Sequence, residues 1–217
     1  MMWNRKFLIV CNFFLYGISS SALSQPNISD CMPEKLFLDS INNYINRWIY
    51  DSDIDADSKI SEMNRLQEIS QNCFEGTSLP VAFLIHKKGV IYHMEGYNGN
   101  ATSYLKAIDN YNQSLNIRLE LNRANSSDLT EEIIQGYIQI ASCYYYLNEL
   151  NGAIQNILKG LDYANNNSEK RSIQMLILRL YTEAARNFEK IGDFDQAIKY
   201  YNGIINHRLV LKEDISE

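Results

Sequence analysis

Apolar side chains recur every three or four residues along most of the chain from residue 33 onward. This spacing places them on one face of a helix, whereas the alternation and Val/Thr enrichment typical of strands are missing. After residue 80 there is no proline. Long helices are therefore favoured, because a proline in a helix interior costs about 3 kcal/mol. The pattern predicts an all-α fold.

The breaks in this pattern predict eight helices. The first begins at Pro33 and the second ends near Cys73, with an acidic stretch between them in which an Asp can cap the second helix. Asp128 with Glu131 has the spacing of a capping box, in which the two side chains bond free backbone N–H groups. The Gly-Tyr-Asn-Gly-Asn stretch at 96–100 predicts a turn. The later helices are expected at 80–94, 103–121, 128–147, 150–164, 168–191 and 193–212.

The first residues are typical of a secretory signal peptide. Arg5 and Lys6 precede an apolar run at 7–18, and small residues follow up to Ser24. We expect residues 1–24 to be cleaved and the protein to be exported, either to a periplasm or out of the cell. The alternative is an uncleaved anchor, although the run is shorter than the roughly 20 residues that span a bilayer. No later segment is apolar enough to cross a membrane.

The cysteines are interpreted in the light of this expected export. Cys31 and Cys73 flank the first two helices and could form a disulfide, because exported compartments are oxidising. Cys143 lies in an apolar helical context and is expected to be a buried thiol. The alternative is that all three are unrelated free cysteines.

Part of the chain repeats itself. Residues 137–161 align with 181–205 at a constant offset of 44 residues. The alignment pairs Tyr137 with Tyr181, Ala141 with Ala185, Tyr144 with Phe188, and Ala153 with Ala197. An earlier segment places Ala107 over Ala153 at an offset of 46. Internal repetition at a fixed period is the mark of a repeat architecture.

The repeat resembles the tetratricopeptide repeat (TPR), whose pattern is W-x2-L-G-x2-Y, then A-x3-F, then P. The best copy here runs from Tyr181 through Ala185 and Phe188 to Ala197-x3-Tyr201. It departs from the family by lacking the proline and by a period longer than about 34 residues. The resemblance implies a right-handed α-solenoid of antiparallel helix pairs. Its expected packing positions are Gly89, Tyr92, Ala107, Tyr111, Ala141, Tyr144, Ala153, Ala185, Phe188, Ala197 and Tyr201.

This organisation divides the chain into a signal peptide, an N-terminal helix pair at 25–79 and a repeat region at 80–217. The repeat region is expected to contain three TPR-like pairs, at 80–122, 128–165 and 168–212. The N-terminal pair lacks the motif and is either a degenerate repeat or a cap. A generic helical bundle is the alternative to the whole scheme.

In such a solenoid the first helix of each pair lines a concave groove. The resemblance therefore implies a scaffold that binds a protein or an extended peptide there. The residues expected in the groove are Phe83, His86, Val90, Gln135, Ile138, Gln139, Ser142, Tyr145, Arg179, Thr182, Arg186 and Glu189. The alternative for any one of them is an ordinary solvated face. A second functional hypothesis is an N-terminal sensory or regulatory TPR segment of a larger signalling or caspase-like (CHAT-type) protease protein.

Charge and motifs exclude several other classes. The formal net charge is −6, and no basic cluster suggests nucleic-acid binding. Zincin, C-x-x-C and phosphate-loop motifs are missing, so no enzyme, cofactor or metal is expected. His86 and His93 lie seven residues apart and could share a ligand or metal, with neutral surface histidines as the alternative.

The last helix has an apolar face made of Ile198, Tyr201, Ile204, Ile205, Leu209 and Leu211. Solenoids usually end in a polar capping element. We therefore expect either self-association through this helix or a continuation in a longer protein.

Overall fold

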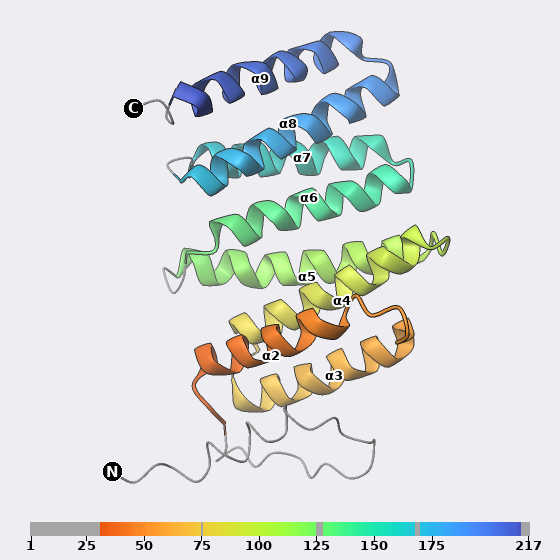
Figure 1. Cartoon of the computed structure of the whole chain (residues 1–217), viewed down its shortest axis with the longest axis vertical. Helices are drawn as coiled ribbons and strands as arrows, with labels where there is room; N and C mark the ends of the chain where they lie inside the picture. The colour runs from red at the N-terminus through yellow and green to blue at the C-terminus, as the bar shows by residue number, and fades with distance from the viewer. Residues whose placement is uncertain (1–30, 75, 125–127, 168–169, 214–217) are drawn as a thin grey trace.

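The computed structural model describes residues 31–74, 76–124, 128–167 and 170–213, so the expected signal peptide lies outside the described residues. Within these ranges the protein is all-α, as predicted, and contains no strand. The helices are stacked along the long axis of the molecule, and from α3 onward each helix packs beside the next one in sequence (Figure 1). They are α2 (Glu34–Trp48), α3 (Ala56–Cys73), α4 (Leu79–Tyr97), α5 (Ser103–Arg123), α6 (Thr130–Tyr146), α7 (Leu150–Asn165), α8 (Arg171–Ile191) and α9 (Phe194–Glu213).

The acidic break before α3 caps that helix, as expected. Asp55 accepts a hydrogen bond from the backbone N–H of Ser58 at 2.8 Å and another from the Ser58 hydroxyl at 2.7 Å. These bonds hold the pKa of the Asp55 carboxyl below its usual value. One of the free N–H groups at the start of α3 is thereby satisfied.

The capping box predicted at the start of α6 is wrong. The N-cap residue is Leu129, and no side chain caps it. Asp128 accepts a hydrogen bond from Lys170, and Glu131 accepts one from the Ser172 hydroxyl at 2.5 Å. Asp128 also accepts a hydrogen bond from the backbone N–H of Thr130 at 3.2 Å, so it satisfies one N–H at the start of α6, but the reciprocal bonds of a capping box are not formed.

The turn predicted at 96–100 begins later than expected, because α4 continues to Tyr97. Gly96 is buried, and a Cβ atom on it would lie 2.7 Å from ring atoms of Tyr104 in α5. Gly96 therefore lets α5 approach α4, and this close packing offsets the poor helix propensity of glycine. The turn itself contains Gly99, whose φ of +106° favours glycine.

Glycine–tyrosine contacts of this kind recur in the later pairs. A Cβ atom on Gly89 of α4 would lie 2.7 Å from the Tyr111 ring of α5. The corresponding distance is 3.0 Å from Gly152 of α7 to Tyr144 of α6. It is 3.4 Å from Gly203 of α9 to the Tyr181 ring of α8. Glycine thus provides the space in which a tyrosine of the partner helix packs.

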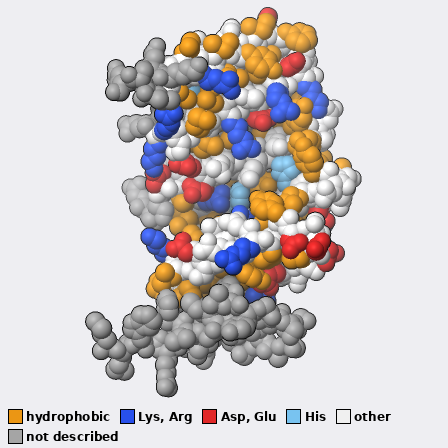
Figure 2. Space-filling model, in the orientation of Figure 1, with side chains coloured by type: hydrophobic (Ala, Val, Ile, Leu, Met, Phe, Trp, Pro, Cys, Tyr) orange, Lys and Arg blue, Asp and Glu red, His pale blue; other side chains and the backbone are white. Residues whose placement is uncertain are grey.

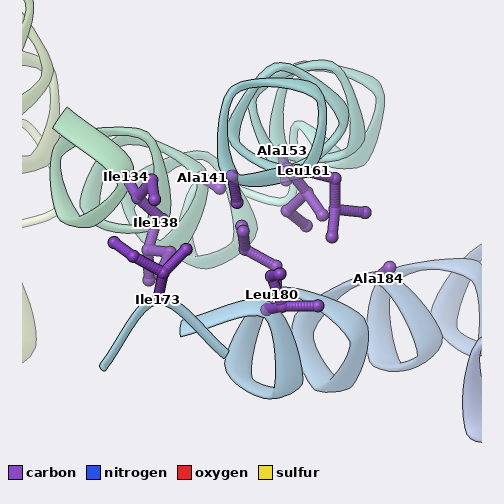
Figure 3. Packing of buried hydrophobic residues seen from close by; sticks show 11 residues of the cluster. Ile134, Ile138, Ala141, Ala153, Leu161, Ile173, Leu180 and Ala184 are labelled. Carbon is purple, nitrogen blue, oxygen red and sulfur yellow. The ribbon is translucent and has the colours of Figure 1, made fainter. Parts of the chain in front are cut away.

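Apolar side chains form three buried clusters along the stack. One joins α6, α7 and α8, and Figure 3 shows Ile134, Ile138 and Ile173 meeting there near Ala141. A second lies mainly on α5 and α6, and a third joins α2 and α3 to α4. Ala141 and Ala185 are almost completely buried, as the repeat alignment predicts.

The N-terminal helices α2 and α3 meet through their side chains rather than through close approach of their backbones. The backbones of α2 and α3 each approach α4 more closely than they approach one another. Side chains of both helices, such as Ile45 and Met63, meet in the third cluster. Glycine is absent from both helices, so large side chains separate their backbones. A disulfide between Cys31 and Cys73, with the Cα atoms 5.4 Å apart, links a position three residues before α2 to the end of α3.

Candidate functional site

Three helices, α4, α6 and α8, share one surface, which we call the α4–α6–α8 face. Its members used below are Phe83, His86, Tyr97, Gln139, Tyr145, Tyr146, Arg186 and Lys190. The Tyr146 hydroxyl of α6 donates to the Tyr97 hydroxyl of α4 at 2.9 Å. Tyr145 of α6 contacts side chains of α8. In the view of Figure 2, histidine side chains lie near the middle of the molecule beside basic and apolar side chains.

The clearest feature of this face is a tyrosine approached by two cations. The Lys190 ammonium lies 4.1 Å from the centroid of the Tyr145 ring, and the Arg186 guanidinium carbon lies 5.4 Å from it. The negative face of an aromatic ring attracts such cations. Arg186 also lies 3.8 Å from Glu183, one turn earlier in α8. Sequence reasoning selected Tyr145 and Arg186 but missed Lys190, although Lys190 follows Arg186 by four residues on the same helix face.

A second group of rings lies between α4, α5 and α6. Tyr146 stacks on Tyr104 with centroids 5.4 Å apart and meets Tyr97 edge-on at 5.0 Å. The His93 ring lies 5.6 Å from that of Tyr104 and 6.2 Å from that of Tyr146. Tyr146 remains 41% exposed, so this group reaches the surface. The sequence does not predict this group, because nothing in the chain pattern links Tyr97 to Tyr146.

His93 is packed among these groups rather than lying free on the surface. Its Nδ1 lies 3.4 Å from the Tyr111 hydroxyl and 3.6 Å from the Cys143 Sγ. Burial lowers the pKa of His93 and raises the pKa of the Cys143 thiol to about 12. Both groups are therefore neutral at pH 7. A reactive cysteine needs a thiolate, and this environment disfavours it.

His86 lies against a buried arginine of α5. Nη1 of Arg118 is 3.3 Å from the His86 Nδ1 and donates to the Glu132 backbone oxygen at 3.2 Å. Arg118 is only 6% exposed, and its burial lowers the guanidinium pKa to about 10. Burial, followed by the positive charges of Arg118 and Lys87, holds the pKa of His86 well below its usual value. The imidazole is therefore neutral and can accept from Arg118.

The other expected groove residues are dispersed. Phe83 is half-buried under the Lys87 ammonium, 5.1 Å from the ring centroid, and the Thr182 hydroxyl donates to the Leu178 backbone oxygen at 2.9 Å. Val90, Gln139 and Ser142 are half-buried, whereas Gln135, Arg179 and Glu189 are exposed. The placement of Ile138 in the groove is wrong, because it is 1% exposed within the cluster of α6, α7 and α8.

Most of the expected packing residues are enclosed. Gly89, Ala107, Tyr111, Ala141, Ala153, Ala185 and Ala197 are buried, while Tyr92, Tyr144 and Phe188 are half-buried. Tyr201 is different: it is 41% exposed, and its hydroxyl donates to Glu189 at 2.9 Å. Its neighbour Tyr200 stacks on Phe188 instead, with centroids 5.5 Å apart. The register of α9 thus packs the ring of Tyr200 against α8, whereas Tyr201 contacts α8 only through its hydroxyl at the surface.

The described helices include none long and apolar enough to cross a membrane. Over the same residues, no group of three or more His, Cys, Asp or Glu side chains could hold a metal ion.

Comparison with solved structures shows a similar fold in BtubC (BKLC) from P. vanneervenii. The TM-score is 0.65, and the match covers 88% of this chain and 68% of that protein at 14% sequence identity. At this identity the likeness concerns the fold alone. No protein-family model matches the chain, and a search of curated proteins finds no match. The all-helical structure and this neighbour are compatible with a helical-repeat protein.

Proposed function

We propose that this protein is an exported TPR-like scaffold, a right-handed α-solenoid of antiparallel helix pairs. It binds a protein or an extended peptide along the α4–α6–α8 face and performs no catalysis of its own. The face contains aromatic, amide and basic side chains, which suit the side chains and backbone of an extended ligand.

The order of the contacts supports antiparallel pairing. Between α4 and α5, Gly89 meets Tyr111 and Gly96 meets Tyr104, so one residue number rises as the other falls. Between α4 and α6 the numbers rise together, since Cys143 contacts His93 and Tyr146 contacts Tyr97. Parallel first helices with antiparallel partners are what a stack of helix hairpins requires.

The observation that carries the binding proposal is the cation–aromatic site on Tyr145. Lys190 and Arg186 of α8 hold their charges over a ring of α6, so two successive repeats build one site. Tyrosine and arginine are enriched among residues that dominate binding energies at interfaces. Both remain accessible, with the Arg186 side chain 50% exposed and Tyr145 half-buried.

Two further observations support the proposed export and the proposed lack of catalysis. The disulfide between Cys31 and Cys73 suits an oxidising compartment and therefore export. The neutral states of Cys143 and His93 support a role without catalysis, because nucleophilic or acid–base chemistry needs groups poised to change protonation near pH 7.

The binding proposal can be tested with a displayed library of random twelve-residue peptides. We expect wild-type protein to enrich a family of related peptides. Tyr145→Ala and Arg186→Ala should weaken their binding at least tenfold while the helical circular-dichroism signal persists. Leu158→Ala on α7 and Arg208→Ala on α9, exposed positions on helices that do not belong to this face, are the controls. Failure to enrich any peptide, or equal binding by all four variants, would contradict the proposal.

A further inference from the structure

Arg118 is a buried cation that forms no direct ion pair among the described residues. It is 6% exposed. Its two partners, the His86 ring and the Glu132 backbone oxygen, are neutral. Removing a guanidinium from water without a carboxylate in direct contact is costly. A fold that keeps such a group has a ready site for an anion.

We propose that the Arg118 niche, formed by Arg118, His86, Lys87 and the Glu132 backbone, binds a carboxylate group. The source is an Asp or Glu side chain of a peptide on the α4–α6–α8 face, so this inference rests on the proposed function. It goes further by naming a chemical group that the peptide must carry and the residue that binds it.

The charges around the niche favour an anion. Burial lowers the pKa of Lys87, and the charge of Arg118 lowers it further. The Lys87 ammonium bonds the neutral Asn46 Oδ1 at 2.9 Å. The carboxylate that acts on Arg118 is that of Glu132, which is exposed and forms no ion pair with it. The two positive charges of Arg118 and Lys87 therefore exceed the single negative charge of the solvated Glu132 carboxylate.

Arg118 also has donors left for a ligand. The hydrogen bonds given by the structure involve Nη1 alone, so Nη2 and Nε have no partner among the described residues. Neither belongs to the fully enclosed polar atoms that lack a partner, so both keep some access to solvent. Guanidinium nitrogens are arranged in a fork that matches the two oxygens of a carboxylate.

A second unpaired group lies further along α6. The Gln139 Oε1 is enclosed and has no hydrogen-bond partner among the described residues. Gln139 follows Glu132 by seven residues, which is two turns on the same side of the helix and roughly 10 Å. About three residues of extended chain span that distance. This oxygen has no access to solvent, so a peptide N–H reaches it only after the Gln139 side chain turns outward, and the proposal rests on Arg118.

The first test follows the His86 ring by NMR in the full-length protein, titrated with sodium acetate at constant ionic strength with chloride. The chain has three histidines, so His86→Asn assigns the resonance. We expect a saturable shift that is lost in Arg118→Met and retained in Arg65→Met, an arginine already paired with Glu62 at 2.7 Å. Without a saturable shift that depends on Arg118, the proposal is overturned.

The second test identifies the source of the carboxylate. An acetylated, amidated Ala-Glu-Ala peptide should reproduce the acetate shift, and its Gln counterpart should bind at least fivefold more weakly. If acetate and inorganic phosphate bind but the Glu peptide does not, the peptide source is overturned. Enriched library peptides that bind Arg118→Met as tightly as wild type would overturn the niche while leaving the proposed function intact. Failure of the library to enrich any peptide would contradict the proposed function alone, because the acetate titration does not depend on it.

Discussion

The N-terminal helices and the repeat helices are held together by different means. In α4 to α9, glycines such as Gly89 and Gly152 let the helices of a pair approach until a tyrosine fills the space between them. In α2 and α3, large side chains such as Ile45 and Met63 meet instead, and the two backbones remain apart. A disulfide joins the ends of this region.

This difference associates the closest helix contacts with small residues: a tyrosine of one helix packs where its partner has glycine. All the helices have buried apolar residues, but only those of the later pairs combine glycine with a facing tyrosine. Where the chain lacks this combination, a covalent link restricts the unfolded chain and so compensates for the looser packing.

The largest effect that would test this comparison is loss of the disulfide. Replacing both Cys31 and Cys73 by Ala should lower the free energy of unfolding by roughly 4 kcal/mol, because the closed loop spans 42 residues. Denaturant titration measures the loss, and a thiol reductant should affect wild type but not the variant. Hydrogen exchange should rise mainly in α2 and α3. An equal rise in α6 to α8 would contradict the comparison.

The next effect concerns the glycine–tyrosine contacts. Gly89→Ala should lower the free energy of unfolding by about 1–3 kcal/mol, because the new Cβ would lie 2.7 Å from the buried Tyr111 ring. Gly136→Ala is the control: its Cβ would lie 3.4 Å from Leu115, and the better helix propensity should give up to about 1 kcal/mol of stability. Urea unfolding of both variants measures the difference. If Gly89→Ala is as stable as Gly136→Ala, the close contact with Tyr111 does not require a glycine at position 89.

Lowering the pH should reduce the free energy of unfolding through His86. This residue lies on α4, which packs against both the N-terminal helices and the repeat helices. The folded pKa of His86 lies well below the unfolded value of about 6.5, so the unfolded chain binds more protons between the two. The stability from keeping His86 neutral is present above pH 6.5 and falls as the pH drops below it, by at most about 1.4 kcal/mol per pH unit. The free energy of unfolding, measured at pH 7.5 and 5.5, should differ less between the two pH values in His86→Asn than in wild type. An unchanged dependence would show that His86 is not the group responsible.

The smallest expected effect lies at the surface. Lys190→Met should lower the free energy of unfolding by about 0.5 kcal/mol, since the Lys190 ammonium lies 4.1 Å from the Tyr145 ring centroid. Lys35→Met, at an exposed site on α2, should stay closer to wild type. Thermal unfolding in low and high salt compares the two. Equal shifts would indicate that the ring contact adds nothing to stability.

The sequence predicts the helices and their small alanines well, because apolar spacing and burial follow the same period. Ala141 and Ala185 were selected from the repeat offset, and both are buried. Gly96 was assigned to a turn, since a glycine followed by Asn and Gly is common in turns. Its helical placement depends on the Tyr104 ring, which lies in another helix.

The site was predicted less completely. Tyr145 and Arg186 were chosen from helix position alone and do lie together. Arg118 could not be found in this way, because an arginine in a helix is usually solvated. Only the packing of α4, α5 and α6 around it makes it buried, and that arrangement is not visible in any one segment.

The burial of Cys143 has a consequence for how the cysteines pair. Thiol–disulfide exchange proceeds by attack of a thiolate, so a thiol that stays protonated and enclosed is a poor participant. The packing of α4, α5 and α6 around Cys143 therefore disfavours exchange between this thiol and the disulfide of Cys31 and Cys73.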